Sequence, residues 1–210
     1  MIKIFFVLMA AAFANGNRVG NGGNLVVCEE NGRRRIELLD FYESSGPWRK
    51  IGSADENQII DETLSALQKI APALAKNYRD RFERLQREIE YKENIQLVSS
   101  QDSFHLIEPL SKKCRLQQAA TRRNSRTDGK KFIFSQDLWK DMPARERAGL
   151  WMHEIVYDHF AQLGEKDSLK ARKMVAYLFS ERIIQESPVE FWAFVGRLRV
   201  PLYREEPQVL

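Results

Sequence analysis

The sequence predicts an α+β protein that is mostly helical, with a small antiparallel sheet, a long amphipathic helical arm and a C-terminal helical bundle. Three observations predict this fold class. Short apolar runs between turn signals are typical of strands, apolar residues recur at helical spacing over 54–93, and helical patterns with start signals fill 143–198. With 43% hydrophobic and 30% charged residues, the composition is that of an ordinary globular chain. We therefore expect one domain over residues 24–203.

Residues 1–14 have the three-part layout of a secretory signal. Lys3 precedes an apolar run, and Ala12-Phe13-Ala14 matches the pattern of a signal-peptidase site. The apolar run is too short to span a bilayer, and no other segment approaches that length. We therefore expect export with cleavage near Ala14, and a soluble mature chain with no transmembrane segment, either periplasmic or extracellular. The Asn- and Gly-rich residues 15–23 then predict a flexible leader.

The first folded unit is predicted to be a β-hairpin. Leu25–Cys28 and Arg35–Leu38 are short apolar runs, and the Asn31-Gly32 pair between them is a strong signal for a tight turn. Residues 38–42 are too apolar for a surface loop, so they either continue the second strand or begin a helical turn. Further short strands are predicted at three places: Ile95–Val98, Phe104–Ile107 and Phe132–Phe134.

The predicted arm begins with a capping-box pattern, in which Ser53 is the N-cap and Glu56 lies three residues later. Apolar residues then recur every three or four positions over 60–89, which indicates one helical stripe. Pro72 lies inside this run, and it must either kink the helix or begin a second one. We expect an arm over 54–93 that either projects partly from the core or folds as a helix pair.

The last third of the chain predicts three helices. Pro143 suits the first position of a helix that runs to Leu163, where Gly164 ends it. The second helix follows Asp167 over 168–184, and the third opens at Ser187-Pro188 and runs to residue 198. The tail, 204–210, is expected to fray.

The charge pattern limits the classes of partner. The formal net charge is +4, and basic clusters such as Arg33-Arg34-Arg35 favour solvated turns over a binding surface. If they do bind, the partner outside the cytoplasm would be an anionic envelope polymer or surface. The chain has no zinc-finger spacing, no basic leucine zipper and no RNA-binding aromatic signature, so we expect no nucleic acid as partner.

The two cysteines, Cys28 and Cys114, form an even pair, which in an oxidising compartment predicts a disulfide. Two free thiols are the alternative. Because the chain lacks Cys-x-x-Cys spacing and has three histidines, we expect no metal site based on cysteine and no cofactor.

One motif could support catalysis: His153-Glu154-x-x-Tyr157, within the first helix of the predicted bundle. In zinc hydrolases, histidines at i and i+4 bind the metal and the intervening Glu activates water. Here the i+4 residue is Tyr157, a poor ligand because its proton has a reference pKa of about 10; His159 lies elsewhere on the helix, so we expect no metal. A metal-free hydrolase would use Glu154 and Asp158, one turn apart, as its acid and base.

The interpretation that we favour is structural. On it, Glu154 pairs with a buried cation, for which Arg172 is the candidate, and removal of the carboxylate would leave that cation unpaired. His153 would be half-buried and satisfied by a neighbour. Gly149 lies one turn earlier and leaves room beside the imidazole for a ligand or another helix.

These patterns together resemble a group of small exported proteins from predatory and related environmental bacteria. The patterns are Asn21-Gly22-Gly23-x-x-Val26-Val27-Cys28, Leu38-Leu39-Asp40-x-Tyr42-Glu43, Cys114-x-x-Gln117-x-Ala119, His153-Glu154-x-x-Tyr157, Gly164, Asp167-Ser168 and Arg172. The resemblance implies no established activity. It does imply that Cys28 pairs with Cys114, and that one spatial cluster contains His153, Glu154, Tyr157, Ser168 and Arg172. One departure is Asp158, where such proteins more often carry a basic residue, which makes this carboxylate look incidental.

We therefore expect an exported, non-enzymatic protein that binds a partner protein or an anionic envelope polymer. The alternative is a hydrolase of a cell-envelope polymer that uses Glu154 as acid/base, with His153 and Tyr157 in support. The surroundings of Glu154 distinguish the two: an open cleft favours the enzyme, and an enclosed contact with Arg172 favours the structural role.

Overall fold

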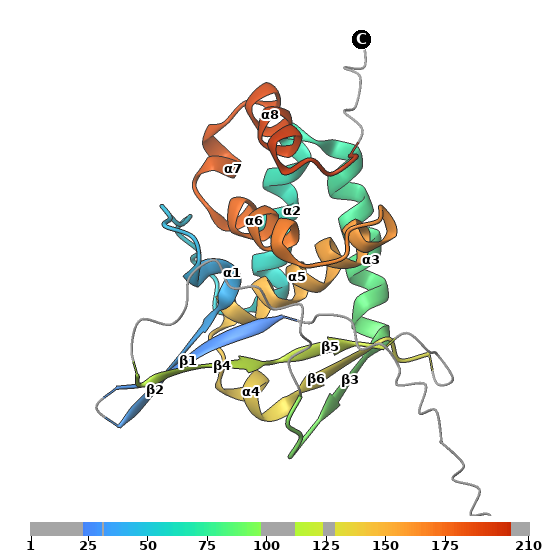
Figure 1. Ribbon diagram of the computed structural model, residues 1–210. Coiled ribbons are helices and arrows are strands. Elements are labelled where there is room, and N and C mark those ends of the chain that lie inside the picture. Colours follow the sequence, from blue (N-terminus) through green and yellow to red (C-terminus); the bar gives the residue numbers. More distant parts are fainter. Residues whose placement is uncertain (1–22, 31, 98–111, 124–128, 203–210) are drawn as a thin grey trace, which may run out of the picture.

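The computed structural model describes residues 23–30, 32–97, 112–123 and 129–202 (Figure 1). The predicted signal, nearly all of the leader, the predicted strand Phe104–Ile107 and the tail lie outside these residues. Among the described residues, no helix combines the length and apolar character needed to cross a bilayer.

The predicted fold class, mostly helical α+β, is confirmed. The helices are α1 (Leu39–Tyr42), α2 (Glu56–Ile70), α3 (Pro72–Glu88), α4 (Gln136–Asp141), α5 (Ala144–Gln162), α6 (Leu169–Phe179), α7 (Arg182–Gln185) and α8 (Pro188–Leu198). The strands are β1 (Asn24–Glu30), β2 (Arg33–Leu38), β3 (Ile89–Lys92), β4 (Cys114–Gln118), β5 (Ala120–Arg122) and β6 (Phe132–Ser135). In Figure 1 the strands form one side of the molecule, and most of the helices are stacked on the other.

The strands form two three-stranded sheets where a single antiparallel sheet was predicted. The first sheet has the order β2-β1-β4 and is antiparallel, and its β1–β2 pair confirms the predicted hairpin. The second has the order β3-β6-β5, with β3 and β6 parallel. Ala119 separates β4 from β5, so one stretch of chain contributes a strand to each sheet. Of the predicted strand Ile95–Val98, the described part contains a single bridge, between Leu97 and Gln118.

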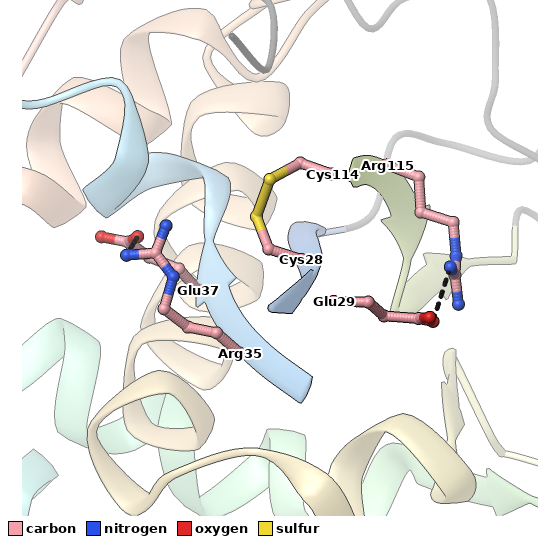
Figure 2. Close-up of a disulfide and its surroundings, with 6 residues drawn as sticks. All are labelled: Cys28, Glu29, Arg35, Glu37, Cys114 and Arg115. Carbon is pink, nitrogen blue, oxygen red and sulfur yellow. Dashed lines mark hydrogen bonds and ion pairs between the residues drawn. A yellow bond between two sulfur atoms is a disulfide. The ribbon is translucent and has the colours of Figure 1, made fainter. Parts of the chain in front are cut away.

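The disulfide between Cys28 and Cys114 is present, as predicted (Figure 2). The two residues face each other across the antiparallel pair β1–β4, and they close a stretch with a sequence separation of 86. Beside the disulfide on the same strands, Arg115 pairs with Glu29 at 3.0 Å. The first sheet is therefore fastened both by its hydrogen bonds and by a covalent link.

The predicted arm is a helix pair packed into the core, and the interpretation as a projecting arm is wrong. Pro72 occupies the first turn of α3 and separates it from α2, which is a position that proline tolerates. Both helices bury their apolar stripe. The N-cap of α2 is Asp55, whose carboxylate accepts the Gln58 N–H. The segment after Glu88 leaves the helix and forms β3.

The predicted bundle is present, with shifted boundaries. Pro143 precedes α5 as its N-cap, and the predicted helix over 168–184 is interrupted at Ser180, which forms a bridge with Trp48. The capping box that opens α8 is formed by Ser187 and Glu190. α5 lies at the centre, against β2, α2, α3 and α6, and is buried on nearly every side. It therefore lacks the one-sided stripe of a surface helix.

Candidate functional site

The residues of the predicted motif lie on the central helix α5, in the interior of the protein. His153 is 1% exposed and Glu154 is fully buried. The space that Gly149 leaves is occupied: a Cβ there would lie 2.6 Å from Phe41 Cζ and 2.8 Å from Leu38 Cδ2. The glycine therefore admits the end of β2 and the start of α1, and these residues leave no room for a ligand.

His153 pairs with Asp40 of α1, a partner that sequence reasoning did not find. The Nδ1 atom lies 2.8 Å from one carboxylate oxygen and 3.1 Å from the other, and both side chains are buried. Burial lowers the pKa of His153, but the charge of Asp40 and its hydrogen bond more than offset this, so the net shift is upward. The Nε2 atom has no hydrogen-bond partner among the described residues.

Glu154 does not pair with Arg172, and that prediction is wrong. Its Oε1 accepts the backbone N–H of Gly23 at 2.8 Å, whereas Oε2 has no hydrogen-bond partner within the described part of the chain. Burial raises the pKa of Glu154 to about 7, against the smaller opposing effects of His153 and the Gly23 N–H. Arg172 instead forms a buried ion pair with Glu43, at 3.1 Å.

The remaining residues of the cluster implied by the resemblance lie at the junction of α5 and α6. The rings of Tyr157 and His153 are 6.2 Å apart, and the Tyr157 hydroxyl donates to the Lys166 carbonyl at 3.5 Å. Ser168 is the N-cap of α6, and its carbonyl accepts the Arg172 N–H. Arg172 opposes protonation of His153 through its charge. His153, Tyr157 and Arg172 thus interact, while Glu154 makes its contact on the strand side.

Asp158, which the resemblance made look incidental, is the centre of an ion-pair cluster. It pairs with Arg81 at 2.9 Å, with Arg122 at 3.1 Å and, more closely still, with Lys131. These groups come from α3, β5 and the residue before β6, which the fold brings to one side of α5. With Arg84, Glu88 and Glu154 of the adjoining pocket included, this region has, among the described residues, four cations and three carboxylates in a largely buried setting. Asp158 is therefore engaged as a counter-ion and is poorly placed to act with Glu154 as an acid/base pair.

A pocket of about 420 Å³ opens beside this cluster, between α3, α5 and the start of β6. We call it the basic pocket. Its lining comprises Asn77, Arg81, Arg84, Leu85, Glu88, Lys131, Phe132, Glu154, Ile155, Asp158 and Gln162. His153 and Tyr157 are not in this lining, so the three candidate catalytic residues do not meet in one hollow. A larger hollow of about 670 Å³ lies along β4 and α4, and its lining contains none of the predicted site residues.

Glu146 is a further buried carboxylate on α5 that sequence reasoning missed. It accepts the Leu38 N–H at 2.7 Å and lies 3.6 Å from Arg145. Burial raises its pKa to about 7, although the Leu38 hydrogen bond and Arg145 act against this. Glu146 thus accepts the backbone N–H of the last residue of β2, as Glu154 accepts the backbone N–H of the residue before β1.

Within the described residues, no three His, Cys, Asp or Glu side chains gather as a metal site. His159 stacks edge-on against Tyr78, and burial lowers its pKa to about 4.

The chain was also compared with known proteins. No family model, no curated protein and no solved structure matches it.

Proposed function

We propose that this is an exported, non-enzymatic binding protein whose basic pocket holds an anionic group of a cell-envelope polymer. The observation that supports this is the cluster of Arg81, Arg122 and Lys131 around the single carboxylate of Asp158, beside a pocket of about 420 Å³. A pocket of this size lies within the usual range for small ligands.

The electrostatics favour an anion in this position. Burial lowers the pKa of Lys131 and of Arg81; Asp158 opposes this effect, and neighbouring cations add to it more weakly. An anion bound beside Arg81, Arg84 and Lys131 would be attracted to all three cations. Charges in a partly dehydrated pocket interact more strongly than charges in bulk water. Arg84 also lines the pocket and forms no ion pair with any described residue, so its guanidinium is available to a ligand.

Binding to a polyanion tests the proposal. In calorimetric titrations, dextran sulfate should bind to the protein and neutral dextran should not. Arg84→Gln should weaken binding by about fivefold. Arg87→Gln, which removes the same charge from an exposed site outside the pocket lining on the same helix, should leave binding unchanged. Equal loss in both variants, or no binding at all, would exclude the basic pocket as the anion site.

Export is part of this proposal and has its own test. The mature protein should be recovered from the periplasm or the medium of the producing bacterium, with Asn15 at its N-terminus. A protein retained in the cytoplasm with Lys3 still present would contradict the proposal.

The second candidate function is hydrolysis of an envelope polymer, and one observation favours it. Glu154 belongs to the lining of the basic pocket and burial raises its pKa to about 7, which suits a general acid at neutral pH. Glu154→Gln separates the candidates if activity on envelope polymer is found. An unchanged melting temperature with lost turnover would establish catalysis.

A further inference from the structure

Glu154 adds a second kind of binding group to the basic pocket. One carboxylate oxygen is held by the Gly23 N–H, and the other is buried with no hydrogen-bond partner among the described residues. Buried polar atoms in folded proteins are nearly always hydrogen-bonded, so an exception at the wall of a pocket calls for an explanation. Glu154 is 0% exposed although it belongs to the pocket lining, so a hydrogen-bond donor of a ligand reaches this oxygen once the side chains that cover it move apart.

The same hollow therefore presents cations and a hydrogen-bond acceptor. Arg81, Arg84 and Lys131 select an anionic group, and Glu154 selects an O–H or N–H donor. A simple carboxylate or a fully ionised phosphate satisfies only the first requirement. A polyhydroxylated acid satisfies both, because it carries its charge and its donors on one small ring.

We propose that the basic pocket binds an acidic sugar residue, with its acid group against Arg81, Arg84 and Lys131 and a ring hydroxyl donating to Oε2 of Glu154. This inference rests on the proposed function and names its ligand class. Acidic sugars are the charged units of acidic polysaccharides, so a site for one residue would also engage such a polymer.

Two acids that differ only in their hydroxyls provide the test. Glucuronate and tetrahydropyran-2-carboxylate share the ring and the carboxylate, but the second has no donor. Calorimetry at pH 8 keeps Glu154 ionised, because its pKa is about 7. Since hydrogen bonds to charged groups are the stronger ones, glucuronate should bind about tenfold more tightly.

Two variants test whether this preference depends on Glu154. Glu154→Gln can still accept the Gly23 N–H, but its amide presents a donor to the pocket. It should reduce the tenfold preference to about twofold, even though the loss of the carboxylate charge strengthens the binding of both acids. Glu146→Gln is the matched control, since Glu146 is also a buried carboxylate of α5 and is not in the pocket lining. It should retain the full preference.

The outcomes separate the two proposals. If neither acid binds and Arg84→Gln has no effect on dextran sulfate, the proposed function fails. The anion site stands and the acidic-sugar inference is overturned in three cases: if both acids bind equally well, if Glu154→Gln keeps the preference, or if neither acid binds while Arg84→Gln still weakens the binding of dextran sulfate. The ligand comparison in the unmodified protein decides the matter even if Glu154→Gln does not fold.

Discussion

Several ionisable side chains of this protein are buried, and each forms an ion pair or a hydrogen bond with a specific partner. Asp40 neutralises His153, Glu43 pairs with Arg172, and Glu154 holds a backbone N–H. Burying such groups is costly unless they are paired. The buried groups of α5 therefore make stability sensitive to pH.

The free energy of unfolding should fall as the pH rises from about 4.5 to about 7. Glu146 and Glu154 have pKa values raised from 4.5 to about 7, so the folded state binds their protons more tightly than the unfolded chain does. Their stabilisation is complete below pH 4.5 and is lost as the pH approaches 7. His153, whose pKa is also raised, acts in the same direction above its ordinary pKa. Urea unfolding between pH 4.5 and 8 measures the effect.

The control for this prediction is the double variant Glu146→Gln with Glu154→Gln, which should flatten the profile. One pKa unit corresponds to about 1.4 kcal/mol, so the two groups together predict a change that is easily measured. Asp55 and Glu190, whose pKa values are lowered by capping hydrogen bonds, act in the opposite direction at lower pH. Stability that rises between pH 5 and 7 would contradict the raised pKa values.

Asp40→Asn should lower both the stability of the protein and the pKa of His153. Without the Asp40 charge, burial remains as the main influence and drives the imidazole pKa below its ordinary value. Loss of this charged hydrogen bond should cost roughly 1.5–3 kcal/mol. NMR titration of the His153 ring and urea unfolding provide the two measurements.

Asp141→Asn is the matched control, because it breaks an exposed ion pair with Arg34. Such pairs contribute less than about 1 kcal/mol. An unchanged His153 pKa in Asp40→Asn would show that the pair does not control the imidazole.

At the scale of the elements, the decisive contact is the one between α5 and the junction of β2 and α1. Gly149 permits it, because Leu38 and Phe41 occupy the place of its missing side chain. The junction in turn carries Asp40 and Glu43 toward the buried groups of α5 and α6. The close packing of Leu38 and Phe41 against Gly149 therefore helps to position Asp40 and Glu43 beside their partners.

Gly149→Ala should destabilise the protein by about 1–3 kcal/mol, since overpacking outweighs the gain in helix propensity. Gly196→Ala provides a contrast in α8, where an added Cβ meets nothing within 4 Å. That variant should gain roughly 0.5–1 kcal/mol. Thermal and urea unfolding of both variants measure the difference, and two stabilising substitutions would show that the α5 contact is looser than described.

For the whole molecule, the disulfide joins the N-terminal hairpin to the strand that links the two sheets. The double variant Cys28→Ala with Cys114→Ala should lose about 4–5 kcal/mol, because it frees a long loop in the unfolded chain. Urea unfolding with and without reductant measures this loss. Reductant should lower the free energy of unfolding of the unmodified protein and leave that of the double variant unchanged. An equal loss of stability in both proteins would show that reductant does not act through this disulfide.

The elements of this protein were largely predictable from sequence, since hydrophobic periodicity and caps are local properties. The hairpin of β1 and β2, the helical third and the capping box at Ser187 are examples. Of the two predicted forms of the segment 54–93, the helix pair is present and the projecting arm is wrong. The residues after Glu88 form a strand that pairs in parallel with β6, a partner distant in sequence.

By itself, the sequence determined the fold class and an even cysteine pair whose bond the structure contains. Only the tertiary structure decided that Asp40, 113 residues from His153 along the chain, is its partner, that Arg172 binds Glu43, and that Asp158 gathers three cations. The physical reason is that a buried charge must find a counter-charge or a hydrogen bond, and which group supplies it depends on which elements pack together. Residue type alone leaves that choice open.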